Sequence, residues 1–388
     1  MWEQIRRGRA PTPERVAQVA ATDAAVLGSD GVAAARDALA AAVLGAGPLE
    51  RLLADPSVTD VLVNGTGGVW VDRGDGLHRQ DADIGDADAV RRLAVRLAGL
   101  AGRRLDETSP FVDGVLPGGV RLHAILPPLV CDGPHLSLRV PSRLALTLDD
   151  LRRGGSLDDA VTGVLGAMVR RRCAFVVSGG TGSGKTTLLG ALLGEVPPAE
   201  RVVLVEDVRE LSVGHPHVVR LQGRPPNVEG RGEVTLTTLV RQCLRMRPDR
   251  LVVGEVRGAE VRELMSALNT GHEGGCGTVH ANTSADVVAR FEALGALAGL
   301  GPAAVHAQML SAVQIVVHLR RAGRVRRVSE VGVLAPGDRG RPQVLPALVE
   351  RTEGAEGAEP GPAGDVVHLV RHPRGWPRLA ELLGVDRP

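Results

Sequence analysis

The sequence predicts an α/β protein with a parallel sheet, preceded by a smaller α+β domain. Three observations support this fold class. From about residue 156 onward, short apolar runs alternate with helical stretches, which is the pattern of a parallel sheet with crossover helices. One of these runs, residues 173–178, leads through a glycine-rich loop into a helix. Before residue 140, apolar and polar residues alternate over short runs, as they do in an antiparallel sheet.

The first part of the chain is expected to contain a helical or flexible N-terminal region, residues 1–46, followed by the α+β domain, residues 47–140. Helix propensity favours a helix over residues 31–44. The α+β domain is expected to have helices over residues 48–55 and 86–100 and strands over residues 58–63, 68–72, 120–126 and 135–139. Residues 141–155, with a proline and a Gly-Gly pair, are expected to form a linker.

The parallel α/β domain is expected to span residues 156–334. Its predicted strands are residues 173–178, 201–206, 250–254, 277–280 and 314–318, with helices over residues 235–245, 259–268 and 284–294. Residues 335–388 are expected to form a Pro/Gly-rich tail, disordered over residues 354–364, with a short strand and helix near its end. We assign this tail no function.

The glycine-rich loop has the spacing G-x-x-x-x-G-K-[ST] of a phosphate-binding loop. Its residues are Gly179, Gly180, Thr181, Gly182, Ser183, Gly184, Lys185, Thr186 and Thr187. The glycines let backbone N–H groups turn toward phosphates, and the following helix presents its positive N-terminal end to them. Lys185 is expected to reach the β- and γ-phosphates, and the Thr186 hydroxyl to hold Mg²⁺. Of the 46 basic residues Lys185 is the only lysine, so this position requires a slim ammonium group.

Composition restricts the class of protein. The 388 residues are 44% hydrophobic and 23% charged, so the chain can build sizeable cores. The net charge of +1 is not the strongly basic profile of a protein that wraps nucleic acid. No run approaches the ~18 apolar residues of a membrane span, and the four cysteines form no C-x-x-C pair. We therefore expect a cytoplasmic protein without a zinc site or disulfide framework.

Acidic side chains follow two of the predicted strands. Glu206 and Asp207 come at the end of one apolar run, and Glu255 follows another. Ligand chemistry collects at such strand ends in an open α/β sheet. One carboxylate can orient and deprotonate an attacking water, while another, with Glu255 the candidate, supports Mg²⁺.

Two histidines, His272 and His280, lie in a glycine-rich stretch before and within a predicted strand. A donor such as His can report whether a γ-phosphate is present, which is the use we favour. Metal binding is a weaker interpretation, because no Cys or carboxylate lies at matching spacing. A loop histidine without a role is the remaining alternative.

Four segments in this order resemble the motifs of the type II/type IV secretion ATPase superfamily. They are GGTGSGKTT, VEDVREL, RMRPDRLVVGEVRG and NTGHEGGCGTVHAN, which resemble the Walker A, Asp-box, Walker B and His-box motifs. The resemblance covers roughly residues 47–334 and is greatest to the Tad/Flp pilus-assembly ATPases, which are also associated with conjugal transfer. It implies a RecA-like P-loop NTPase core and a PAS-like N-terminal domain.

The resemblance also implies a hexameric cytoplasmic ATPase that uses ATP and Mg²⁺, docks on inner-membrane platform proteins and acts on pilin indirectly. Glu206 would be the catalytic carboxylate, supported by Asp207 and Glu255, and His272 and His280 would be the His-box residues. Arg121 matches an N-terminal-domain arginine that reaches the nucleotide. Arg241 or Arg245 would approach the site from the core domain or from a neighbouring subunit, because an arginine supplied in trans can raise the rate about 10³–10⁵-fold.

Two departures and two alternatives qualify this resemblance. Val115 stands where relatives commonly have an arginine, and the strand around Arg139 lacks a lysine that relatives have. A DNA-translocating conjugation ATPase is one alternative, which the near-neutral charge and scarce aromatic residues disfavour. A nucleotide-gated scaffold that does not hydrolyse ATP is the other, which the intact Lys185, Thr186 and carboxylates disfavour.

Overall fold

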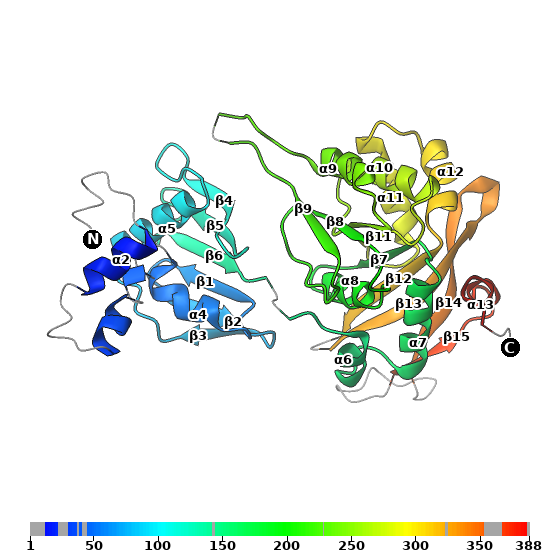
Figure 1. The fold of residues 1–388 in the computed structure, drawn as a ribbon, viewed down its shortest axis with the longest axis horizontal. Coiled ribbons are helices and arrows are strands. Elements are labelled where there is room, and N and C mark those ends of the chain that lie inside the picture. The colour runs from blue at the N-terminus through cyan, green and yellow to red at the C-terminus, as the bar shows by residue number, and fades with distance from the viewer. Residues whose placement is uncertain are drawn as a thin grey trace. The chain divides into compact units, whose positions relative to one another are not determined.

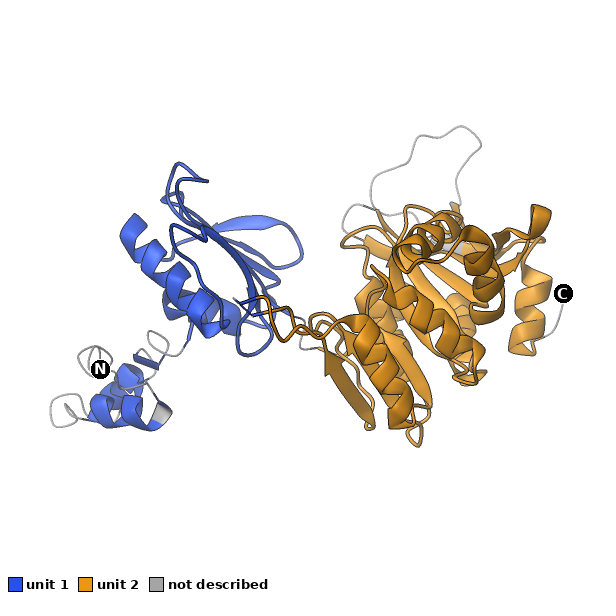
Figure 2. Ribbon diagram, turned by 90° about the horizontal axis from the view of Figure 1, so that it is seen from above, with its two compact units in different colours: residues 1–142, 227–229 blue, residues 143–226, 230–388 orange. Residues whose placement is uncertain are grey.

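The computed structural model describes residues 12–21, 30–36, 39–40, 45–141, 144–227, 229–322, 325–352 and 367–385. The chain divides into two compact units (Figure 2). The first comprises residues 1–142 and 227–229, and the second residues 143–226 and 230–388. Each unit has a sheet and a hydrophobic core of its own.

The first unit is built on a six-stranded antiparallel sheet with the order β3-β2-β1-β6-β5-β4. Its strands are β1 (Asp60–Asn64), β2 (Val69–Asp72), β3 (Leu77–Gln80), β4 (Phe111–Val115), β5 (Arg121–Ile125) and β6 (His135–Arg139). Alternation puts Leu136 and Leu138 in the core and leaves Ser137 and Arg139 exposed. The strands that the sequence did not predict are β3, which has no buried residue, and β4, which contains a glycine.

The helices of the first unit are α2 (Pro13–Ala20), the 3₁₀ turn η2 (Gly47–Leu49), α4 (Glu50–Ala54) and α5 (Ala87–Leu100). Asp86 caps the start of α5, because its carboxylate accepts a hydrogen bond from the Ala89 amide at 2.8 Å. Its buried side chains, including Leu93 and Leu97, share the core with the inner face of the sheet. Part of the helix expected over residues 31–44 lies outside the described residues.

The second unit is built on a nine-stranded sheet with the order β15-β14-β13-β12-β7-β11-β10-β8-β9. The strands from β12 to β9 in that order run parallel, and β12 to β15 pair antiparallel. Their bounds are β7 (Phe175–Gly179), β8 (Val202–Glu206), β9 (Val218–Gln222), β10 (Arg250–Val253), β11 (Cys276–His280), β12 (Ile315–Ala322), β13 (Val325–Pro336), β14 (Pro342–Thr352) and β15 (Val367–Arg371).

Helices cover both faces of this sheet (Figure 1). One face carries α6 (Leu148–Arg153), α7 (Asp159–Arg170), α8 (Lys185–Gly194) and α13 (Trp376–Leu383). The other carries α9 (Leu236–Cys243), α10 (Glu260–Asn269), α11 (Asp286–Leu297) and α12 (Pro302–Ala312). The remaining 3₁₀ turns are η3 (Leu244–Met246) and η4 (Asp338–Gly340). The central strands are buried on both sides, which explains their continuous apolar sequences.

The sheet continues beyond residue 334, where the sequence analysis placed the start of the tail. β14 pairs with both β13 and β15, and α13 packs on the same core through Trp376 and Leu379. β14 was not predicted from the local sequence pattern because it contains Pro342 and Pro346, and proline is rare inside a paired strand. Residues 354–364, predicted to be disordered, lie outside the described residues.

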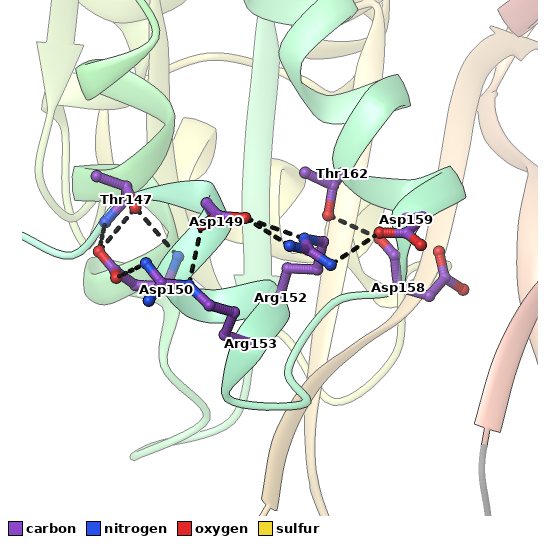
Figure 3. A network of polar contacts seen from close by, with 8 residues as sticks. All are labelled: Thr147, Asp149, Asp150, Arg152, Arg153, Asp158, Asp159 and Thr162. Atoms are coloured by element: carbon purple, nitrogen blue, oxygen red, sulfur yellow. Dashed lines mark hydrogen bonds and ion pairs between the residues drawn. The ribbon is translucent and has the colours of Figure 1, made fainter.

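The segment predicted as a linker contains helix α6 (Figure 3). Thr147 and Asp150 form a reciprocal capping box at its start. Arg152 forms ion pairs with Asp149 at 2.8 Å and Asp159 at 3.1 Å, so it joins α6 to the start of α7. Asp158 caps α7 and accepts a hydrogen bond from the Leu369 amide of β15 at 3.1 Å. A hollow of about 410 Å³ opens at this corner, and none of its lining residues belongs to the glycine-rich loop.

Candidate nucleotide-binding site

The glycine-rich loop joins β7 to α8 in conformations that only glycine adopts readily. Gly179, Gly182 and Gly184 have φ angles of +153°, +69° and +95°. Gly184 is the N-cap of α8. A methyl group on Gly179 would lie 2.5 Å from Ser183 Oγ and 2.6 Å from the Leu319 carbonyl oxygen, so the backbone there has no space for a side chain. The loop therefore has the backbone shape of a phosphate-binding loop at a helix N-terminus.

Lys185 lies folded over the loop, with its side chain buried. Its Nζ donates hydrogen bonds to the carbonyl oxygens of Gly179 at 3.0 Å and Gly180 at 2.7 Å. Burial lowers the pKa of Lys185, and the negative charges of Glu255 and Glu210 oppose that shift. The ammonium group is thus held inside the loop and close to acidic side chains.

The other loop residues differ in exposure. Ser183 is buried and its hydroxyl donates to the Gly180 carbonyl oxygen at 2.9 Å, which closes the loop internally. Thr186 is half-buried in the first turn of α8, and the exposed residues are Gly180, Thr181, Gly182 and Thr187. The exposed rim is the part of the loop that a ligand can approach.

Glu206 ends β8 and is almost fully buried, with 4% of the residue exposed. Its Oε1 accepts hydrogen bonds from the backbone amides of Glu210 at 2.9 Å and Leu211 at 2.8 Å. Its Oε2 lies 3.5 Å from Arg220 Nη1. Burial raises the pKa of Glu206 despite these interactions, so the carboxylate is a stronger base than an exposed glutamate.

Arg257 connects two of the predicted carboxylates. Its guanidinium contacts Asp207 at 3.5 Å and Glu255 at 2.8 Å. The other oxygen of Glu255 lies 3.0 Å from His280 Nε2. Burial lowers the pKa of His280, and the nearby Lys185 lowers it further, while Glu255 acts in the opposite direction. The structure therefore brings Lys185, Glu255 and His280 together; sequence analysis quoted the segment containing Arg257 without assigning that residue a role.

Three other predicted residues lie at the opposite edge of the sheet within one protomer. His272 precedes the amino end of β11, and its Nδ1 lies 3.3 Å from the Ala267 carbonyl oxygen. Arg241 lies in the last turn of α9 and pairs with Glu263 at 2.6 Å. Arg245 is exposed in η3, before the amino end of β10. The phosphate loop, by contrast, follows the carboxyl end of β7, so these residues do not share its edge.

Arg121 belongs to the first unit, where it begins β5. It lies opposite Arg139 of β6 on one side and Val115 of β4 on the other. Directly opposed residues of paired strands point to the same face of a sheet. The three positions that sequence analysis singled out in this domain are therefore neighbours on one face.

A third histidine, which sequence analysis did not identify, lies beside the loop. His318 of β12 is buried and pairs in register with Ser178 of β7. The Ser178 hydroxyl and His318 Nδ1 are 2.9 Å apart. Burial lowers the pKa of His318, while a hydrogen bond to the backbone of Asn282 raises it. His318 thus connects the strand before the phosphate loop to the segment after His280.

Among the described residues, no group of three His, Cys, Asp or Glu side chains is arranged to hold a metal ion. The predicted Mg²⁺ ligands, the Thr186 hydroxyl and a Glu255 oxygen, are oxygen donors of the kind Mg²⁺ prefers. Mg²⁺ usually takes only one or two protein oxygens and completes its shell with phosphate and water. No helix in the described part of the chain is long and apolar enough to cross a membrane.

Comparison with known proteins identifies the family. Residues 43–338 match the model of the type II/IV secretion system protein family. The chain belongs to this family. A Mycobacterium tuberculosis protein, whose name assigns it to conjugal transfer, is 54% identical over 328 residues, which cover 82% of this chain and 93% of that protein. The conjugal transfer protein TrbB of Rhizobium radiobacter is 33% identical over 284 residues, covering 72% of this chain and 84% of TrbB.

A solved structure supports the fold at a greater evolutionary distance. The ATPase DotB of Legionella pneumophila superposes with a TM-score of 0.51 at 18% identity, covering 77% of this chain and 79% of DotB. The predicted RecA-like core with an α+β domain before it is confirmed by this family and by the fold of this structure. The resemblance to the secretion ATPase superfamily, drawn from four motifs, is confirmed as well.

Proposed function

We propose that this type II/IV secretion family protein is a hexameric ATPase that drives assembly of a Tad/Flp-type pilus or a related secretion apparatus. The single observation that carries the proposal is the cluster around Lys185. Its ammonium group lies on the carbonyl oxygens of a phosphate loop, and its charge is close to the Glu255–His280 pair. A phosphate-binding loop, a cation and a carboxylate at one edge of the sheet are parts that nucleotide hydrolysis requires.

ATP would bind with its phosphates in the loop between Gly179 and Thr187. The Lys185 ammonium would exchange its two carbonyl contacts for phosphate oxygens, which carry full negative charge and so make stronger hydrogen bonds. The Thr186 hydroxyl and Glu255 would hold Mg²⁺, which when bound neutralises charge on the phosphate oxygens. The half-exposed position of Glu255, with 28% of its side chain accessible, suits a ligand that arrives with the nucleotide.

Glu206 is proposed as the base that orients water and accepts its proton. Two backbone amides fix Oε1, which leaves Oε2, 3.5 Å from Arg220, as the oxygen that can turn toward water. The raised pKa of Glu206 supports this role, because a stronger base takes a proton more readily. Asp207 is proposed to act through Arg257, which also holds Glu255.

His280 is proposed as the sensor of the γ-phosphate. It accepts or donates at Nε2 beside Glu255 and lies at the end of β11, next to the start of the loop. His272, Arg241, Arg245 and Arg121 are kept as candidates for contacts completed in the hexamer. An oligomeric motor of this kind needs an arginine supplied by a neighbouring subunit. This requirement is the reason for keeping the three arginines as candidates.

The protein is proposed to act at the cytoplasmic face of the inner membrane, where it would dock on platform proteins and move pilin indirectly. Membership of the secretion family supports this setting. The decisive experiment compares ATP turnover of the parent with Lys185→Ala and Glu206→Gln. We expect both variants to be inactive and Glu206→Gln to retain ATP binding. Full turnover by Lys185→Ala would refute the assignment of the site.

A conjugal-transfer ATPase acting on DNA is the second candidate, because two relatives carry conjugal transfer names. The near-neutral net charge of +1 favours the protein-moving function. The two are separated by adding single- and double-stranded DNA to the turnover assay. Stimulation that falls steeply with salt would favour the DNA motor, and an unchanged rate would favour pilus or secretion work.

A further inference from the structure

Glu255 lies on a turn, residues 254–258, which begins where the strand β10 ends. The hydrogen-bonded ladder between β10 and β11 stops at the pair Val253 and Gly277. The turn continues from there to Ala259, the N-cap of α10. Backbone groups beyond the end of a strand have no ladder to pair with, so other contacts must satisfy them and fix the turn.

Thr278, the next residue of β11, holds the turn on the side of the sheet. Its hydroxyl donates a hydrogen bond to the Gly254 carbonyl oxygen at 2.7 Å. Its carbonyl oxygen accepts a hydrogen bond from the Val256 amide at 2.8 Å. Thr278 is only 1% exposed, so water has little access to these bonds. One buried residue is therefore bonded to the turn on both sides of Glu255.

Glu260 holds the other end of the turn. Its Oε1 accepts hydrogen bonds from the backbone amides of Arg257 at 2.7 Å and Gly258 at 2.8 Å, and the residue is 5% exposed. Both amides precede the N-cap Ala259, so these bonds fix the turn and do not cap the helix. Arg257 is also the residue whose guanidinium contacts Glu255 at 2.8 Å. Glu260 thus fixes the backbone of a residue that holds Glu255.

The turn lies among the residues of the candidate site. A methyl group on Gly254 would lie 2.8 Å from Cγ of Glu206, so the turn packs against the proposed base. Glu255 Oε1 lies 3.0 Å from Nε2 of His280, which is two residues beyond Thr278 in the same strand. The position of the turn therefore sets where Glu255 lies relative to Glu206 and His280.

We propose that Thr278 and Glu260 are positioning residues that hold Glu255 where it supports Mg²⁺. The inference rests on the proposed ATPase function, in which Glu255 has that role. Partners that orient a metal-supporting side chain typically contribute about 10–100-fold to metal affinity or activity. The phosphate loop makes its own contacts with the nucleotide, so binding without Mg²⁺ is expected to be independent of both residues.

The test measures the dissociation constant of a fluorescent ATP analogue for the full chain over a series of free Mg²⁺ concentrations, including none. Thr278→Val keeps the shape of the side chain and removes the hydroxyl, and Glu260→Ala removes the carboxylate. We expect each to raise the half-saturating Mg²⁺ concentration about tenfold, with affinity without Mg²⁺ unchanged within about twofold. Thr278→Ser and Glu260→Gln keep the oxygens that make these bonds, so we expect both to behave like the parent.

Asp158→Ala is the matched control. Asp158 also accepts hydrogen bonds from two backbone amides, Val161 at 2.7 Å and Leu369 at 3.1 Å, but at the start of α7. We expect this variant to unfold at a lower temperature, as loss of a cap does, without a change in Mg²⁺ dependence. Because Thr278 acts through Glu255, Thr278→Val should add no further shift in a Glu255→Gln background.

Four results overturn the inference. A half-saturating Mg²⁺ concentration within about twofold of the parent refutes the role of whichever residue was changed, and a shift in Glu255→Gln then leaves the proposed function standing. An equal loss of affinity without Mg²⁺ refutes it, because the damage would then lie in the fold of the site. A full additional shift in the double variant refutes action through Glu255. Parental Mg²⁺ dependence in Glu255→Gln itself refutes the proposed role of Glu255 together with the inference.

Discussion

Replacing the buried Arg250 with methionine is expected to destabilise the second unit strongly. Arg250 begins β10 with 1% of its side chain exposed. Its Nε pairs with Glu200 at 2.6 Å, and Nη2 donates to the Val169 carbonyl oxygen at 2.9 Å. A longer contact of 3.4 Å reaches the carbonyl oxygen of Gly274, in the loop that follows His272. One side chain therefore ties β10 to α7 and to the loop before β11.

The expected loss of unfolding free energy follows from the groups that lose Arg250 as a partner, Glu200 above all. Removing one partner of a buried ion pair costs about 3–5 kcal/mol of unfolding free energy. Glu200 keeps a second partner, because Arg172 contacts its other oxygen at 2.9 Å, and 13% of its side chain is exposed. We therefore expect the lower value, about 3 kcal/mol. At about 2–4 °C per kcal/mol for a unit of this size, the unfolding temperature should fall by roughly 6–12 °C.

Scanning calorimetry of the full chain measures this effect, and the transition that ATP shifts identifies the second unit. Arg172→Met is the matched control, since Arg172 pairs with the same Glu200 but its side chain is 41% exposed. We expect the control to lose less than about 1 kcal/mol. Equal losses of unfolding free energy in the two variants, or no loss in Arg250→Met, would refute the view that the buried Arg250 side chain stabilises the contacts of β10 with α7 and with the loop before β11.

Three further predictions concern the site. Glu206→Gln should reduce turnover at least about 100-fold in steady-state assays, while calorimetry at pH 7 shows no loss of stability. No stability is lost because the pKa of Glu206 is higher in the folded than in the unfolded protein, so the ionised carboxyl destabilises the fold once the pH exceeds its unfolded pKa. Retained turnover in Glu206→Gln would contradict the role of Glu206 as the base. The acid limb of the kcat profile should lie above the ordinary Glu value of about 4.3, and Arg220→Gln should move it upward, because Arg220 lowers that pKa; a downward move would contradict this. His318→Ala should cost about 1–3 kcal/mol by leaving the Ser178 hydroxyl without this partner, and adding Ser178→Ala should recover part of that loss; strict additivity would rule out the pair.

Much of the central sheet could be predicted because its signal is local. The apolar runs over residues 173–178, 201–206 and 250–254 predicted buried strands, and the structure has β7, β8 and β10 there. The short strand and helix expected near the end of the chain correspond to β15 and α13, but the strands β13 and β14 could not be predicted in the same way. Their pairing depends on contacts between distant segments, and the prolines of β14 break the local pattern.

The candidate site, too, could be predicted where its residues are contiguous in the sequence and could not be predicted where distant segments meet. A contiguous motif predicted the phosphate loop, whose glycine conformations the structure contains. His318 and Ser178 meet only because β12 pairs beside β7, and no spacing along the chain encodes that contact. His272 lies at the far edge of the sheet from the loop because it precedes β11, whereas the loop follows β7. Attention to which end of a parallel strand each residue flanks would have indicated this.

The central claim is that ATP is hydrolysed at the Lys185 loop by an oligomer whose sites are completed between subunits. The most direct test is steady-state ATP hydrolysis per protomer over a wide range of protein concentration, with Lys185→Ala as the blank. We predict that specific activity rises cooperatively with concentration and vanishes in the blank. Activity that is independent of concentration in a particle shown by sizing to be a monomer would contradict the claim, as would activity that persists in Lys185→Ala.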